Sequence, residues 1–107
     1  MSRKLIHYLR NERRETGLTQ ADMAALLGAP WTSRVSRYER RAALPPLETA
    51  LGYEAVTRKP VSKLFAGMYD KVEERVKERA KNLLARSGQA HTALQLRRKR
   101  SLERILQ

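Results

Sequence analysis

The sequence contains no cysteine, only one tryptophan and one phenylalanine, and no long run of apolar residues. Without cysteine the chain has neither disulfides nor thiolate metal ligands. The lack of a long apolar run argues against a membrane-spanning helix. The charged N-terminal segment MSRKLIHYLRNERR has no apolar core of the kind that signal peptides contain. We therefore expect a soluble, cytoplasmic protein.

Acidic residues are also scarce. The 107 residues include 11 Asp and Glu against 23 Lys and Arg, which gives a formal net charge of +12 and a pI near 10.9. Such an excess predicts an anionic partner, either nucleic acid or an anionic membrane surface, and says little about the fold. Because 41% of the residues are hydrophobic, the chain is predicted to fold.

Alternation of apolar and polar residues, the pattern of β-strands, is absent as well. Apolar residues recur instead at helical spacing along most of the chain, so the sequence predicts an all-α fold. A chain of 107 residues suffices for one domain, or for a small domain with an appendage.

Two short helices are predicted before residue 29. The first covers residues 4–16 and has three apolar side chains at helical spacing: Leu5, Ile6 and Leu9. Gly17 suits its C-terminus, because glycine readily adopts a positive φ. The second begins at Thr19, a good N-cap, with Asp22 in its first turn. Its apolar face contains Met23, Ala24 and Leu27, and Gly28 ends it.

A third helix is predicted from Thr32, within APWTSRVSRYERR. At about 100° per residue, its inner side contains Val35, Tyr38, Glu39 and Ala42. Its outer side contains Ser33, Ser36, Arg37 and Arg40, with Arg34 and Arg41 at the flanks. This arrangement predicts a helix that is anchored by two large side chains and that presents cations to solvent.

Helical spacing continues to the end of the chain. The segment after Pro46 is expected to bury Leu47, Ala50, Leu51 and Val56 and to stop before Pro60. Residues 61–86 form a long helical pattern, with Gly67 as a candidate point of division and Glu73 and Lys77 as a favourable i,i+4 pair. Residues 89–107 contain the basic run LRRKR and a further apolar stripe.

The block LRNERRETGLTQADMAALLG…SRVSRYERRAALPPLETAL closely resembles the Xre-type helix-turn-helix family, which includes the phage Cro and repressor proteins. The matching positions are Arg13, Gly17, Leu18-Thr19-Gln20, Met23-Ala24, Leu27-Gly28 and Val35-Ser36-Arg37-Tyr38-Glu39. The resemblance covers about residues 5–65. It implies a compact bundle of about five helices of the phage-repressor DNA-binding type in residues 1–66, and a C-terminal helical extension in residues 67–107 for dimerisation or partner binding.

The resemblance also implies roles for individual residues. Base edges would be contacted by Thr32, Ser33, Ser36, Arg37 and Arg40. Phosphates would be contacted by Gln20, Arg13, Arg34 and Arg41. Arg13 would also form a partly buried ion pair with Glu39. Arg37 is the strongest candidate for specificity, because arginine can bind guanine O6 and N7 with two hydrogen bonds.

Two positions, Arg41 and Trp31, leave alternatives open, and Pro46 departs from the pattern of the family. Arg41 stands where the family commonly has glycine, so either it adopts a left-handed conformation or the third helix continues. Pro46 replaces the usual serine cap of the fourth helix, so that one capping hydrogen bond is lost. Trp31 is expected to cover the edge of the core, with insertion against DNA as the alternative.

The function expected from the resemblance is that of a sequence-specific transcriptional regulator. It would act as a repressor and would bind double-stranded DNA as a homodimer at an inverted-repeat operator. The alternative is the antitoxin of a toxin–antitoxin pair, in which residues 89–107 fold onto a protein partner. No arrangement of catalytic side chains or metal ligands is present in the sequence, so we expect neither an enzyme nor a cofactor, and no membrane partner.

Overall fold

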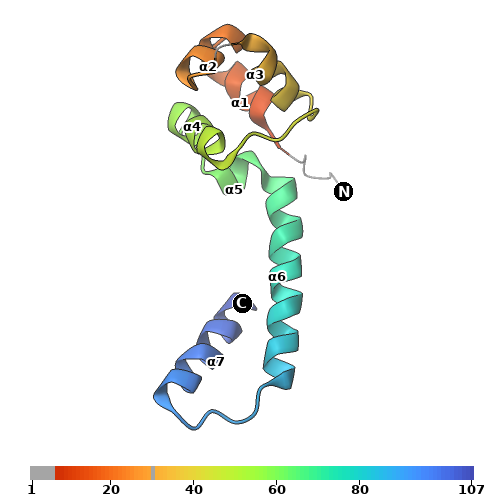
Figure 1. The fold of residues 1–107 in the computed structure, drawn as a ribbon, viewed down its shortest axis with the longest axis vertical. Coiled ribbons are helices and arrows are strands. Elements are labelled where there is room, and N and C mark those ends of the chain that lie inside the picture. The colour runs from red at the N-terminus through yellow and green to blue at the C-terminus, as the bar shows by residue number, and fades with distance from the viewer. Residues whose placement is uncertain (1–6, 30) are drawn as a thin grey trace. The chain divides into compact units, whose positions relative to one another are not determined.

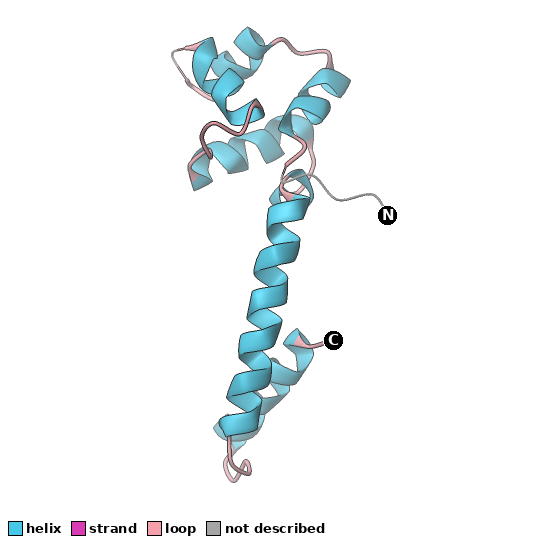
Figure 2. Ribbon diagram, turned by 90° about the vertical axis from the view of Figure 1, so that its right-hand side faces the viewer, coloured by secondary structure: helices cyan, strands magenta, loops and turns pink. Residues whose placement is uncertain are grey.

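A computed structural model of the protein describes residues 7–29 and 31–107. These residues form seven helices and no strand (Figures 1 and 2), which confirms the all-α prediction. They divide into two units, Met1–Tyr69 and Asp70–Gln107, whereas the sequence placed the division after residue 66. The predicted apolar residues Leu5 and Ile6 lie outside the described part of the chain.

The first unit contains five complete helices. These are α1 (Leu9–Thr16), α2 (Gln20–Leu26), α3 (Thr32–Glu39), α4 (Leu47–Thr57) and the short α5 (Val61–Leu64). Helix α1 contacts both α3 and α4, and α3 packs mainly on α2. Helix α1 therefore lies between the α2–α3 pair and α4.

Local signals set the C-terminal end of α1 and the start of α2 as predicted, but residues 7 and 8, which the predicted first helix included, are not helical. Gly17 ends α1 with a φ of 79°, the left-handed conformation that glycine adopts at little cost. Thr19 caps α2: its hydroxyl accepts from the Asp22 backbone N–H and its own N–H donates to the Asp22 carboxylate, both at 3.0 Å. Gly28, with a φ of 73°, turns the chain after α2.

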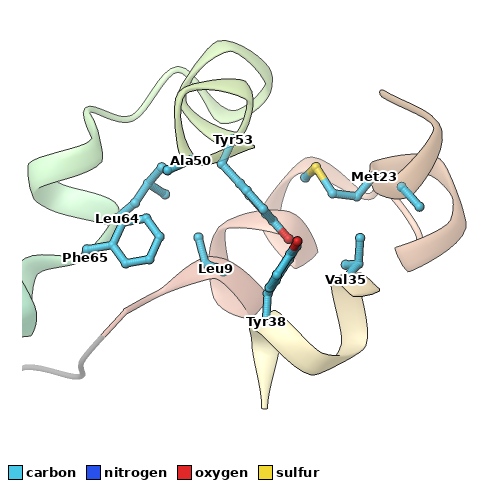
Figure 3. Packing of buried hydrophobic residues seen from close by; sticks show 9 residues of the cluster. Leu9, Met23, Val35, Tyr38, Ala50, Tyr53, Leu64 and Phe65 are labelled. Atoms are coloured by element: carbon cyan, nitrogen blue, oxygen red, sulfur yellow. The ribbon is translucent and has the colours of Figure 1, made fainter. Parts of the chain in front are cut away.

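The core of the first unit receives one fully buried side chain from each of its five helices (Figure 3). These are Leu9, Met23, Val35, Tyr53 and Leu64, in chain order. Ala24, Tyr38, Ala50 and Phe65 complete the buried cluster. Because every helix contributes to one core, the orientation of α3 is fixed by contacts with the rest of the unit.

Helix α4 faces the core with a different side from the predicted one. Leu47 and Leu51 are 72% and 51% exposed, so their predicted burial is wrong, while Ala50 is buried as expected. Tyr53 is fully buried and points from α4 toward Tyr38 (Figure 3). The Tyr53 ring lies in the core, so the side of α4 that faces the core is the one that contains Tyr53 and Ala50.

The Tyr53 hydroxyl has no hydrogen-bond partner among residues 7–29 and 31–107. Burial raises its pKa above the usual range, and the nearby Glu39 carboxylate acts in the same direction. Because an unpaired buried hydroxyl is destabilising, we expect Tyr53→Phe to leave the free energy of unfolding unchanged or to raise it by about 1 kcal/mol. Urea unfolding measures this. Tyr53→Leu, which removes the ring, is the destabilising control, and a loss of more than about 1 kcal/mol in Tyr53→Phe would contradict the expectation.

Helix α6 (Ala66–Arg86) begins in the first unit and continues into the second. The division of the 61–86 segment lies at Phe65 and not at Gly67, because the non-helical backbone of Phe65 (φ −112°, ψ 43°) separates α5 from α6. This break accompanies burial of the Phe65 ring in the core. The predicted Glu73–Lys77 pair is present, with an N–O distance of 3.6 Å.

The second unit also contains α7 (Ala93–Ile105). Thr92 caps this helix through reciprocal hydrogen bonds with Gln95, at 3.0 and 3.1 Å. Ala80 and Leu102 are the buried hydrophobic side chains of this unit, 3% and 9% exposed. The basic run 97–100 lies on α7 and is exposed. Residues 89–107 are therefore mostly helical in the isolated chain.

Candidate nucleic-acid interface

Helices α2 and α3 are consecutive and pack on each other, and α3 has two unlike sides. Val35, Tyr38 and Glu39 of α3 are 0%, 7% and 8% exposed. Figure 3 shows Val35 and Tyr38 directed into the core. The opposite side is open to solvent: Thr32, Ser33, Arg34 and Arg37 are exposed, and Ser36 is half-buried. Because the one acidic residue of α3 is Glu39, the exposed side has hydroxyl groups and cations but no carboxylate.

Arg13, Glu39 and Gln20 form a polar cluster that connects α1, α2 and α3, and Arg13 and Glu39 are buried within it. Arg13 Nε and Nη2 donate to the two Glu39 carboxylate oxygens at 2.6 and 3.0 Å. Arg13 Nη1 donates to the Leu18 carbonyl at 2.9 Å. The hydrogen bond to Glu39 raises the pKa of Arg13 further above its usual value. This fork fixes the C-terminal end of α3 relative to α1.

The geometry separates the two roles that were considered for Arg13. Its side chain is 11% exposed and three of its donors are already used within the protein. A guanidinium in this position can hold Glu39 but has little surface to offer a phosphate. The structure thus favours the ion pair over the phosphate contact for Arg13.

Gln20 is the first residue of α2, and its side chain belongs to the same cluster. Its Nε2 donates to Glu39 Oε1 at 3.2 Å. A side-chain amide has two N–H groups, so one remains for a partner outside the protein. Gln20 is only half-buried. Gln20 therefore helps to position Glu39, and its second amide N–H remains available for the expected phosphate contact.

Trp31 precedes α3 and lies at the surface. It is 61% exposed, so the expectation that it covers the core edge is wrong. The Arg34 guanidinium lies 6.0 Å from the centre of the Trp31 ring, a cation–π contact that restricts the arginine. Sequence reasoning missed this contact, although its i,i+3 spacing is a usable signal. The Trp31 ring and the Arg34 guanidinium therefore lie close together at the N-terminal end of α3.

Helix α3 ends at Glu39 in a Schellman motif. The Ala42 N–H donates to the Arg37 carbonyl at 2.9 Å, and the Arg41 N–H donates to the Tyr38 carbonyl at 3.1 Å. Arg41 adopts φ 63°, the left-handed alternative, and the helix does not continue. Ala42 is consequently exposed and not on the inner face of the helix as predicted. Arg40 and Arg41 are both exposed beside the end of α3.

The predicted site residues therefore lie on α2, on α3 or directly after α3, apart from Arg13, which is buried on α1. Comparison of the chain with protein-family models, curated proteins and solved structures finds no match.

Within residues 7–29 and 31–107, no helix combines the length and apolar character needed to cross a bilayer. No three metal-binding side chains are grouped in that part of the chain.

Proposed function

We propose that this protein is a sequence-specific double-stranded DNA-binding transcriptional regulator, that it represses transcription, and that its first unit is of the phage-repressor type. The observation that supports the proposal most directly is the two-sided α3. Its inner residues Val35 and Tyr38 are buried, while Arg34 and Arg37 are exposed with no carboxylate beside them on the helix. A single α-helix fits the major groove of B-DNA.

The proposed mechanism divides the exposed residues by the part of DNA that they would meet. Arg37 and Ser36, on the outer side of α3, would meet base edges together with Thr32, Ser33 and Arg40. Arg34, Arg41 and the free amide hydrogen of Gln20 would meet phosphates, which orient the helix without reading sequence. The Arg13–Glu39 fork, with distances of 2.6 and 3.0 Å, would hold α3 rigidly during this contact.

We also propose that the protein acts as a homodimer. The second unit has an exposed apolar stripe on α6, consisting of Val72, Val76 and Leu83, which are 47%, 40% and 36% exposed. Their spacing places them on one side of the helix. A second copy of the same stripe would cover it, and a symmetric dimer would present two α3 helices to successive major grooves, ~34 Å apart.

The alternative, an antitoxin, receives less support. That interpretation requires residues 89–107 to fold onto a partner protein. Helix α7 already has a capping box at Thr92 and buries Leu102 in the isolated chain. Leu94 and Leu96 remain 69% and 41% exposed, so contact with a protein partner is still available to a folded α7. We therefore place the regulator first.

Selection of bound sequences from a random pool of duplex DNA tests this function. We expect an inverted repeat whose half-sites are centred about 10 bp apart, or a multiple of it, because each α3 occupies one major groove. Affinity for the selected duplex should fall steeply as salt rises, since binding releases counterions. Enrichment of no motif, with binding equally weak for all duplexes, would contradict sequence-specific regulation. A single, asymmetric motif would contradict the homodimer.

A further inference from the structure

The positive charge of the chain is concentrated toward its C-terminal end. Residues 79–107 contain eight Lys and Arg and one carboxylate side chain, Glu103, so this segment supplies +7 of the formal net charge of +12. The preceding residues 70–78 contain three basic and four acidic residues. All of residues 79–107 belong to the second unit, whereas α3 belongs to the first. The larger part of the charge excess therefore has no role in the proposed function of α3.

Helix α7 arranges part of this charge as a stripe along one side. Arg97, Arg100 and Arg104 are all exposed, and we call these three residues the arginine stripe. At about 100° per residue they lie within roughly 60° of one another around the helix. Leu102 lies on the opposite side and is 9% exposed. Burial of Leu102 thus leaves the arginine stripe directed away from the interior of the second unit.

The cations of α7 have no acidic partner in the described part of the chain. The ion pairs of residues 7–29 and 31–107 lie outside α7. Arg97 and Arg100 are three residues apart, and Arg100 and Arg104 are four apart, so each pair places like charges side by side on the helix. Like charges at these spacings destabilise a helix. An anionic partner would remove that repulsion.

The geometry of the arginine stripe suits the phosphate backbone of a duplex. From residue 97 to residue 104 the stripe extends over about 10 Å of helix. Each strand of duplex DNA presents one phosphate per ~3.4 Å of its axis, so the stripe matches about three successive phosphates. A guanidinium can bind a phosphate with two hydrogen bonds. Single strands are usually held by stacking on aromatic side chains, and residues 70–107 contain no Phe, Tyr or Trp.

A folded α7 is less well suited to an anionic membrane. A basic amphipathic helix binds a bilayer by inserting an apolar face. On α7 the apolar Leu102 is already buried within the protein. The exposed Leu94 and Leu96 lie about 160° apart around the helix, so they cannot enter a bilayer together. The observations therefore favour nucleic acid over a membrane as the polyanionic partner.

We infer that the arginine stripe of α7 is a second DNA-binding surface, which binds the phosphate backbone of a duplex independently of its sequence. Phosphate contacts orient and strengthen a complex but do not read bases. The stripe would therefore raise the affinity for every duplex by the same factor, while sequence preference remains with α3. This inference does not rest on the proposed function, because a phosphate contact requires no recognition helix.

The test uses a triple variant of the full-length protein, Arg97→Gln with Arg100→Gln and Arg104→Gln. The three side chains are exposed, and glutamine is a good helix former, so the fold should be retained. Circular dichroism and thermal unfolding check this.

A second triple variant is the charge-matched control. Lys59→Gln, Lys63→Gln and Arg75→Gln together remove the same charge from exposed positions outside α7. These residues lie on three different segments and form no stripe. Any effect of net charge alone should appear equally in both variants.

Binding to a duplex of about 20 bp and arbitrary sequence is measured between about 50 and 200 mM salt. If each arginine of the stripe neutralises one phosphate, its removal should make the slope of log K against log [salt] shallower by about 2.7 per protomer. The affinity of the wild type should then fall about 40-fold more than that of the stripe variant over this range. The control should change the slope by less than about 1. Equal changes in the two variants would overturn the arginine stripe as a binding surface.

The outcomes separate this surface from the proposed function and from a membrane partner. If selection from random DNA yields no motif but the stripe variant loses duplex affinity as described, the surface stands and sequence-specific regulation falls. If a motif emerges and the stripe variant binds as the control does, regulation stands and the surface falls. Vesicles of phosphatidylglycerol and phosphatidylcholine are the remaining probe. Vesicle binding that is tighter than duplex binding, and that is lost in the stripe variant alone, would overturn DNA as the partner.

Discussion

Replacement of Arg13 by alanine should lower the free energy of unfolding by about 3–5 kcal/mol, a large part of the stability of a domain of this size. The reason is the carboxylate that remains. The Glu39 side chain is 2% exposed, and its two oxygens accept from Arg13 at 2.6 and 3.0 Å. Without Arg13, the Gln20 amide, at 3.2 Å, would be the one side-chain donor left to the Glu39 carboxylate among residues 7–29 and 31–107. Urea or thermal unfolding measures the loss.

Two controls show whether the charge left behind is the cause. Arg14→Ala removes the same charge from an exposed neighbour on α1 and should change stability by no more than about 0.5 kcal/mol. The double replacement Arg13→Met with Glu39→Leu removes both charges and should recover most of the stability, because apolar side chains of similar volume often replace a buried pair without loss. If Arg13→Ala costs less than about 1 kcal/mol, the carboxylate is hydrated in solution and the buried fork is not a structural requirement.

The second large effect is expected on specificity. Arg37→Ala should remove the preference at one base position of each half-site, a loss of about 1–3 kcal/mol in discrimination, or about 5- to 150-fold. Arg37 is exposed, and the buried residues Val35 and Tyr38 of its helix are unaffected by the change, so the fold should be retained. Binding to a panel of single-base variants of the selected operator, at one salt concentration, measures the preference profile.

Lys63→Ala is the matched control for Arg37→Ala. It removes one positive charge from an exposed position on α5 in the same unit. It should lower the affinity for all sequences by the same small factor and leave the preference profile intact, because a distant charge acts on DNA only through the overall field. An unchanged profile in a folded Arg37→Ala protein would show that α3 is oriented differently from the proposal, or that another element makes the base contacts.

Much of the fold was accessible from local sequence. Periodic apolar residues predicted helices, and turn chemistry set several ends: Gly17 and Gly28 have positive φ, and Thr19 with Asp22 caps α2 as expected. The inner and outer sides of α3 also followed from spacing, apart from Ala42. These features depend on residues within one or two helical turns of each other, so a single sequence contains the information.

The rotation of α4 and the position of Trp31 were not accessible in this way. Leu47 and Leu51 were as good candidates for burial as Ala50 by spacing, but Tyr53 fills the centre of the core and turns both leucines to solvent. Trp31, expected at the core edge, instead lies beside Arg34 at the surface. Which of these side chains is buried depends on how side chains from five helices pack together, and the spacing of residues within one helix does not contain that information.

The candidate site likewise combines features that the sequence predicted with features that only the tertiary structure decided. The sequence alone determined that the chain is basic, that it is helical, and that Arg34 and Arg37 face outward from a short helix; which bases they meet stays a prediction. The resemblance also implied the partly buried Arg13–Glu39 ion pair, which the structure contains. Only the tertiary structure joined Gln20 to Glu39. Those contacts are between residues far apart in the sequence, and their geometry exists only once the helices have packed around a common core.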